Sequence, residues 1–119
     1  RNDAPADVKC NFWDQLTAIV LGAKRRSAAA LVLLIDANAR VGSVQGPGVG
    51  SVAPDAENSN GSFFRMFLES TSLVAANAFV DAGPTWVSTF MTETRLDYVC
   101  TDVLAQPRVE QVCVHQDID

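Results

Sequence analysis

The sequence has few of the residues that mark several common protein classes. Among its 119 residues are three cysteines and one histidine. Cys10, Cys100 and Cys113 have neither the paired spacing of a zinc site nor the density of a disulfide framework. This scarcity favours a reducing compartment, so we expect an intracellular protein of the nucleus or cytoplasm. A hairpin that brings Cys100 opposite Cys113 is the alternative.

Positive charge and long apolar runs are also scarce. Nine basic residues stand against fourteen acidic ones, a net charge of -5, which argues against a domain that holds nucleic acid by its own basic surface. A divalent cation can still supply positive charge at a phosphate. The longest apolar run, Ala28 to Ile35, is far shorter than a membrane span, so we expect no membrane partner. The first residue is Arg1 and the last residues resemble a strand running into a loop, so we expect the chain to continue at both ends.

Apolar residues make up 48% of the chain, enough for the core of one domain. Their helical spacing predicts a helix over about 6–23, with an apolar face formed by Val8, Phe12, Leu16, Ile19 and Ala23 and widened by Trp13 and Val20. The continuous apolar run 29–35 predicts a central strand that is covered on both faces.

The rest of the chain predicts a mixture of helix and strand. Residues 41–60, with a glycine-rich part at 42–50, predict a long loop, and its glycines lack the pattern of a phosphate-binding loop. A mobile surface loop is therefore favoured. The other predicted elements are a helix over 62–70 capped by Asn60 or Ser62, strands at 73–79, 85–90, 96–101 and 109–115, and a turn at 81–84. This order indicates one α+β layered domain without internal repeats.

Asp36 and Asn38 directly follow the predicted central strand. Ends of central strands are where functional sites gather, and residues two apart on a strand point the same way. Aspartate can hold a metal or accept a proton from water, and asparagine can donate to a phosphoryl oxygen. Together they suit attack of water on a phosphodiester. The alternative is that both residues only form the turn after the strand.

Asp97 lies among apolar residues of a predicted strand, where a carboxylate needs a partner. Arg95 is two residues away on the same face, so a structural ion pair and a catalytic role are both open. Trp86 fits the core, or a base stacked near a phosphodiester site. The single histidine, His115, is expected to be an exposed polar residue away from Asp36.

Four stretches in order resemble the endonuclease/exonuclease/phosphatase superfamily, the DNase I-like proteins. The nearest likeness is to the apurinic-endonuclease-like domain of non-LTR retrotransposons. The stretches are Ile35-Asp36-Ala37-Asn38-Ala39 for the family's G-D-F-N-A, Asn58 to Phe63 for N-x-N-G, Leu73 to Phe79 for L-x-x-x-N-T-F, and Thr85-Trp86 followed by Arg95-Leu96-Asp97-Tyr98 for T-W and R-L-D-Y. The likeness runs from about residue 12 to residue 119.

The resemblance implies that residues 1–119 are the C-terminal part of one such domain, a four-layer α/β sandwich. It implies a Mg²⁺-dependent endonuclease of a retrotransposon-like element, with nucleic acid as partner of the full-length protein. Asp36 would activate water and hold the metal, Asn38 would bind the scissile phosphate, and Asp97 would orient a catalytic histidine. Trp86 and Tyr98 are the residues expected to contact substrate.

The chain departs from the family pattern at Ile35, which replaces a glycine, at Ala37, which replaces an aromatic residue, and at Asp3, which replaces tyrosine or histidine. The family's metal-binding glutamate and Asp-His pair are not matched. The resemblance therefore predicts that the 119-residue chain alone hydrolyses DNA negligibly. Two other functions remain open: a phosphoesterase of the same superfamily that acts on phosphoinositides or other small esters, and a non-catalytic remnant that binds a partner. Missing layers would leave an apolar sheet face exposed.

Overall fold

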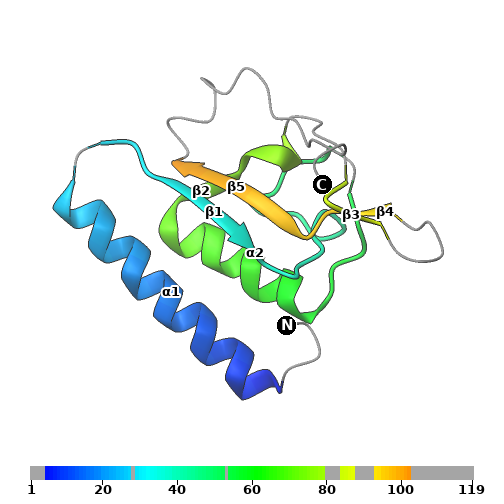
Figure 1. The fold of residues 1–119 in the computed structure, drawn as a ribbon, viewed down its shortest axis with the longest axis horizontal. Helices are drawn as coiled ribbons and strands as arrows, with labels where there is room; N and C mark the ends of the chain where they lie inside the picture. Colours follow the sequence, from blue (N-terminus) through cyan, green and yellow to red (C-terminus); the bar gives the residue numbers. More distant parts are fainter. Residues whose placement is uncertain (1–4, 28, 53, 80–83, 88–92, 103–119) are drawn as a thin grey trace, which may run out of the picture.

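The computed structural model describes residues 5–27, 29–52, 54–79, 84–87 and 93–102. These residues form helices and a small antiparallel sheet, so the predicted mixed α+β class is confirmed at that level (Figure 1). In chain order the elements are α1 (Ala6–Arg26), β1 (Val32–Asp36), α2 (Ser59–Thr71), β2 (Leu73–Ala75), the 3-10 turn η1 (Ala76–Ala78), β3 (Trp86–Val87), β4 (Glu93–Thr94) and β5 (Asp97–Asp102).

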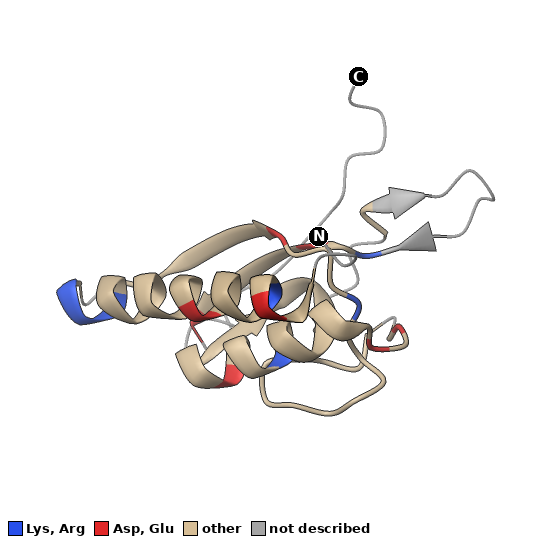
Figure 2. Cartoon of the chain, turned by 90° about the horizontal axis from the view of Figure 1, so that it is seen from below, with Lys and Arg blue, Asp and Glu red and all other residues tan. Residues whose placement is uncertain are grey.

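The three-stranded sheet has the order β1-β5-β2, with β5 antiparallel to both neighbours. Directly opposed residues point to the same face, so the inner face is formed by pairs such as Leu33 with Cys100 and Ile35 with Tyr98. Both helices lie on this inner side of the sheet (Figure 2). The described chain is therefore a helix layer packed on a sheet layer.

The prediction that the strand around 29–35 is covered on both faces is wrong for the described residues. Side chains of β1 alternate between half-buried and exposed, and Val32 and Leu34 are 61% and 73% exposed on the outer face. Val32 and Leu34 thus give β1 an apolar outer face in the described part of the chain.

Helix α1 begins at the predicted residue, but its buried face is rotated from the predicted one. Trp13 and Val20 are buried, whereas Val8, Phe12 and Ile19 are at least half exposed. The indole NH of Trp13 donates to the side-chain oxygen of Asn60 in α2. Trp13 also contacts the rings of Phe64 and Phe67, so the large indole determines which side of α1 faces the core.

Helix α2 begins three residues earlier than predicted, and Asn58 caps it in place of Asn60 or Ser62. The side-chain oxygen of Asn58 accepts from the NH of Gly61 at 2.7 Å, the usual geometry of a helix N-cap. The helix ends at Ser72, which is in the left-handed region with φ 55° and whose NH donates to the carbonyl of Glu69.

The long loop before α2 packs against the domain. Val41 and Val49 are buried in the core, and the carbonyl of Gly48 accepts from the NH of Ala75 on β2. A side chain at Gly48 would overlap Leu68 and the Leu73 carbonyl, which explains the glycine. Parts of this loop are therefore built into the core, while residues 43–45 lie on the surface as expected, and the mobility of the loop stays a prediction.

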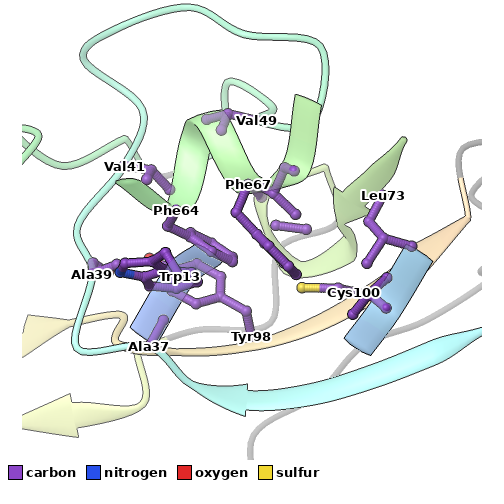
Figure 3. Close-up of a cluster of buried hydrophobic side chains, with 14 residues drawn as sticks. Trp13, Ala37, Ala39, Val41, Val49, Phe64, Phe67, Leu73, Tyr98 and Cys100 are labelled. Atoms are coloured by element: carbon purple, nitrogen blue, oxygen red, sulfur yellow. The ribbon is translucent and has the colours of Figure 1, made fainter. Parts of the chain in front are cut away.

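The core lies between the two layers (Figure 3). Phe64 of α2 packs on Tyr98 of β5 with ring centroids 4.6 Å apart and ring planes tilted by 41°, and Cys100 lies on the same side of that strand (Figure 3). The predicted strand 73–79 is divided into β2 and η1, while β5 fits the prediction to within one residue. The turn at 81–84 lies largely outside the described residues, and the strand at 109–115 lies wholly outside them.

Replacing Gly61 is expected to destabilise the fold. A methyl group at this position would overlap the carbonyl oxygen of Arg40, which is backbone and cannot yield easily. We expect Gly61→Ala to lower the free energy of unfolding by about 1–3 kcal/mol, as overpacked sites do. Gly22 in α1 is the matched control, because its nearest neighbours are arginine side-chain ends at 3.8 Å or more. Gly22→Ala should stabilise by up to about 1 kcal/mol. Urea denaturation measures both, and equal effects would contradict the predicted contact.

Cys100 is a free thiol with 0% exposure, and burial raises its pKa to about 12. Cys10 is free and exposed. Because the thiolate is the reactive form, iodoacetamide at about pH 8 should label Cys10 and spare Cys100 until urea unfolds the chain. Mass spectrometry of the peptides reads this out. Labelling of Cys100 at the same rate as Cys10 in the folded protein would contradict its burial.

Candidate functional site

Asp36 and Asp97 lie directly opposite each other at the end of the sheet. They are paired in the antiparallel register of β1 and β5. Opposed residues of such a pair have Cβ atoms about 4.5–5.5 Å apart and share one face. The structure therefore brings together two carboxylates that are far apart in the sequence, at the place where β1 ends.

Thr85 holds the start of β5. Its hydroxyl oxygen accepts from the NH of Leu96 at 2.8 Å and from the NH of Asp97 at 3.1 Å. Burial raises the pKa of the Asp97 carboxyl, a hydrogen bond with Thr85 lowers it, and the Asp36 carboxylate raises it again. The net shift of the Asp97 pKa is upward, chiefly because burial disfavours the charged form, with the Asp36 carboxylate adding to it.

Asn38 follows this pair and takes a conformation that few residues adopt. Its φ is 49°, in the left-handed region that asparagine tolerates better than most residues. Its NH donates to the Asp36 side chain at 3.3 Å, so Asp36 also forms the turn that the sequence left open as an alternative. Asp36 therefore belongs both to the turn after β1 and to the carboxylate pair with Asp97.

The segment from Ala37 to Arg40 is held from three sides. The NH of Ala37 donates to the Leu96 carbonyl at 3.0 Å, and the Tyr98 hydroxyl donates to the Ala39 carbonyl at 2.6 Å. The NH of Arg40 donates to the same Asn58 oxygen that caps α2.

Two asparagines at the start of α2 add longer contacts to this segment. The Asn58 amide lies 3.4 Å from the Asn38 carbonyl, and the Asn60 amide lies 3.4 Å from the Ala37 carbonyl. Asn60 also accepts from the Trp13 indole. The N-terminus of α2 therefore ties α1 to the turn that carries Asp36 and Asn38.

A cavity of about 220 Å³ opens beside this turn. Asp36, Ala37, Asn38 and Asn60 form its polar wall, and Val8, Lys9 and Phe12 of α1 line it from the other side. The Lys9 ammonium group is largely buried and donates to the Ser59 hydroxyl at 2.6 Å. The contribution of α1 was missed from the sequence, because it depends on how the helix packs.

The structure gives Tyr98 a different place from the expected contact with substrate. Its side chain is 3% exposed, and its hydroxyl donates to the carbonyls of Ala39 and Arg95. Burial raises the pKa of Tyr98 to about 12. Tyr98 therefore supports the turn from inside the core, and its burial gives no support to the predicted contact with substrate, which stays a prediction.

The structural ion pair between Arg95 and Asp97 is not formed. Arg95 is buried, donates to the carbonyls of Val52 and Asn77, and lies 5.6 Å from the centroid of the Tyr98 ring. Arg95 is therefore not the charge partner of Asp97.

Three further residues were singled out in the sequence. Ile35, which departs from the family glycine, packs against the core on the face opposite to Asp36. Trp86 begins β3, which pairs with β4, and its contact with substrate stays a prediction. His115 lies outside the described residues, so its distance from Asp36 also stays a prediction.

The site offers oxygen donors only. Two carboxylates and the carboxamide of Asn38 are the ligand types that Mg²⁺ prefers, with one or two carboxylates completed by waters and substrate phosphate. Within the described residues no group of three or more His, Cys, Asp or Glu side chains is close enough to hold a metal by itself. The donor set therefore fits a cation that takes part of its coordination from water or from a phosphate.

Comparisons with known proteins found no match to the chain among protein-family models, curated proteins or solved structures. None of the helices in the described part of the chain has the length and hydrophobicity of a membrane span.

Replacing Asp36 by asparagine is expected to stabilise the fold at neutral pH. Like charges that face each other across a strand pair cost about 0.2–1 kcal/mol, and Asp36→Asn keeps the oxygen that accepts from Asn38. A carboxyl whose pKa is raised on folding, as that of Asp97 is, destabilises the fold when it ionises.

The gain of Asp36→Asn should therefore be present at pH 7. It should vanish below about pH 3, where Asp97 is neutral in the folded and unfolded states and no longer repels a neighbouring charge. Thermal unfolding across this pH range measures it. Asp14→Asn on the exposed face of α1 is the control, and a loss of stability in Asp36→Asn would contradict the repulsion.

Proposed function

We propose that Asp36, Asn38 and Asp97 form a site for metal-assisted hydrolysis of a phosphodiester. The observation that carries this proposal is the pairing of Asp36 with Asp97 at the end of the sheet, next to a cavity that Asp36 and Asn38 line. A fold gains nothing in stability from opposing two carboxylates, so their juxtaposition is more often retained for a site than for packing. The order of the sequence motifs supports the same reading.

Each residue has a chemical task in this proposal. Mg²⁺ bound at Asp36 and Asp97 would supply positive charge to a phosphate oxygen. Asp36 takes a proton from the attacking water, since a carboxylate within reach of water can act as a general base. Asn38 donates from its amide to a phosphoryl oxygen and so lowers the cost of the extra negative charge. Thr85 fixes the position of Asp97.

The proposal extends to the larger fold and the partner. The sheet with one apolar outer face is compatible with a place inside a four-layer DNase I-like sandwich, and residues 1–119 then form the C-terminal part of that domain. Nucleic acid is the proposed substrate, as for an endonuclease of a mobile element. A cation at the carboxylates offsets the acidity of the chain at this point.

Metal binding tests the proposal directly, because the chain alone is expected to turn over too slowly for kinetics. Mn²⁺ added to the ¹⁵N-labelled 119-residue chain should broaden the NMR signals of residues 36–38 and 97 before others. Asp36→Asn and Asp97→Asn should each weaken Mn²⁺ binding by about tenfold or more, as loss of one ligand of a weak site does. Mg²⁺ should compete.

The matched control is Asp14→Asn, which removes one acidic charge on the exposed face of α1 and should leave Mn²⁺ affinity unchanged. Broadening that begins elsewhere, or that Asp36→Asn leaves intact, would sink the proposed site. Plasmid DNA with Mg²⁺ is a second readout. Rapid, EDTA-sensitive nicking that persists in Asp36→Asn would show that the catalytic groups lie elsewhere.

A further inference from the structure

The cavity beside Asp36 has two walls of opposite character. Val8 and Phe12 of α1 form an apolar wall, and both side chains are half exposed at 54% and 50%. Asp36 and Asn38 line the other side, together with Asn60, whose carboxamide is buried and bonded to Trp13. A half-exposed aromatic ring beside a hydrogen-bonding wall suits a flat, heteroatom-rich group better than it suits an alkyl chain or a bare phosphate.

The position of this cavity defines which part of a substrate reaches it. Asp36 and Asn38 line it and also carry the proposed chemistry, so a substrate whose phosphate lay at these residues would have its neighbouring group beside the cavity. A volume of about 220 Å³ admits one ring system and not a stacked pair of bases. We propose that this cavity binds the nucleobase adjacent to the scissile phosphate, stacked on Phe12. This inference rests on the proposed function of Asp36 and Asn38.

The charge distribution supports a stacking site. The basic turn of α1, Lys24 to Arg26, lies at the opposite end of the helix from Val8 and Phe12 (Figure 2). Those three cations are therefore remote from a phosphate at Asp36, and Lys9, which lines the cavity, is 8% exposed and donates to the Ser59 hydroxyl. With a net charge of -5, the chain has little electrostatic attraction for a nucleic-acid backbone. Stacking does not depend on that charge, and each base stacked on an aromatic ring contributes about 1–3 kcal/mol.

The substrate class follows from this arrangement. A base in the cavity has left the helical stack, so single-stranded nucleic acid, or a nucleotide that has been unstacked, is the form that binds. Small phosphoesters without a ring would leave the apolar wall uncovered and bind more weakly. The Trp13 ring packs edge to face against the Phe12 ring, with 5.1 Å between the ring centroids.

Two diesters of equal charge test the inference: thymidylyl-thymidine, and the same diester made of two abasic tetrahydrofuran units. Both are titrated by NMR into the 119-residue chain with Ca²⁺ present. We expect the base-bearing diester to bind about tenfold tighter, within the range of one stacked base. Phe12→Ala should bring its affinity down to that of the abasic diester, and Phe12→Trp should keep the difference.

Ile19→Ala is the matched control, because Ile19 is a 65% exposed apolar residue of the same helix outside the cavity. It should leave both affinities unchanged. Phe12 is half exposed, so its replacement should leave the NMR spectrum of the core intact, which the same experiment shows. Equal affinity for the two diesters, or a preference that survives Phe12→Ala, overturns the inference.

The two proposals fail separately. If Mn²⁺ broadens residues 36–38 and 97 but the base makes no difference, the metal site stands and the base site is wrong. If the base is preferred through Phe12 while Mn²⁺ avoids these residues, the cavity is a base-binding site without the proposed hydrolysis.

Discussion

The side-chain oxygen of Asn58 connects helix α2 to the turn that follows β1, and the rest of the described structure depends on this connection. It accepts from the NH of Gly61 at 2.7 Å and from the NH of Arg40 at 3.0 Å. One atom thus caps α2 and fixes the end of the turn that follows β1. A substitution that removes this oxygen would leave two backbone donors without it, one on the helix and one on the turn, and the loss of a helix N-cap costs about 0.5–2 kcal/mol. Gly61 is glycine for the same reason, because the turn passes directly over it.

Helix stability and site geometry are therefore coupled here. The buried aromatic residues Trp13 and Tyr98 also form hydrogen bonds that connect them to the turn. Trp13 reaches it through Asn60, and Tyr98 reaches it through the Ala39 carbonyl. The register of β1 with β5 places Asp36 opposite Asp97. The surrounding contacts hold this register and so keep the two like charges together despite their repulsion.

The sequence predicted the existence of most elements and missed how they face one another. The helix 6–23 follows from apolar spacing, but the helix carries two apolar faces, one with Trp13 and Val20 and one with Phe12 and Ile19. Which face is buried depends on the packing against α2, which the sequence does not show. Asn58, Asn60 and Ser62 can each cap a helix, so the capping residue could not be chosen without the position of Arg40. Asp36 stood out by its place after an apolar strand and Asp97 as a carboxylate within one, but only the family resemblance put them in one site, because no local pattern reveals a cross-strand pair. The cavity wall formed by Val8 and Phe12 lies beyond sequence reasoning altogether, since it exists only after α1 packs.

The register of β1 with β5 also has a consequence for how the chain folds. It joins residues that are 97 − 36 = 61 positions apart, with the long loop, α2 and β2 between them. Closing a contact of that sequence separation is entropically costly, so it forms after the local turns of the helices. The two carboxylates thus meet late, when most of the core is already buried. Their repulsion then acts on the rate at which the finished structure opens, and it leaves the rate at which the core assembles almost unchanged.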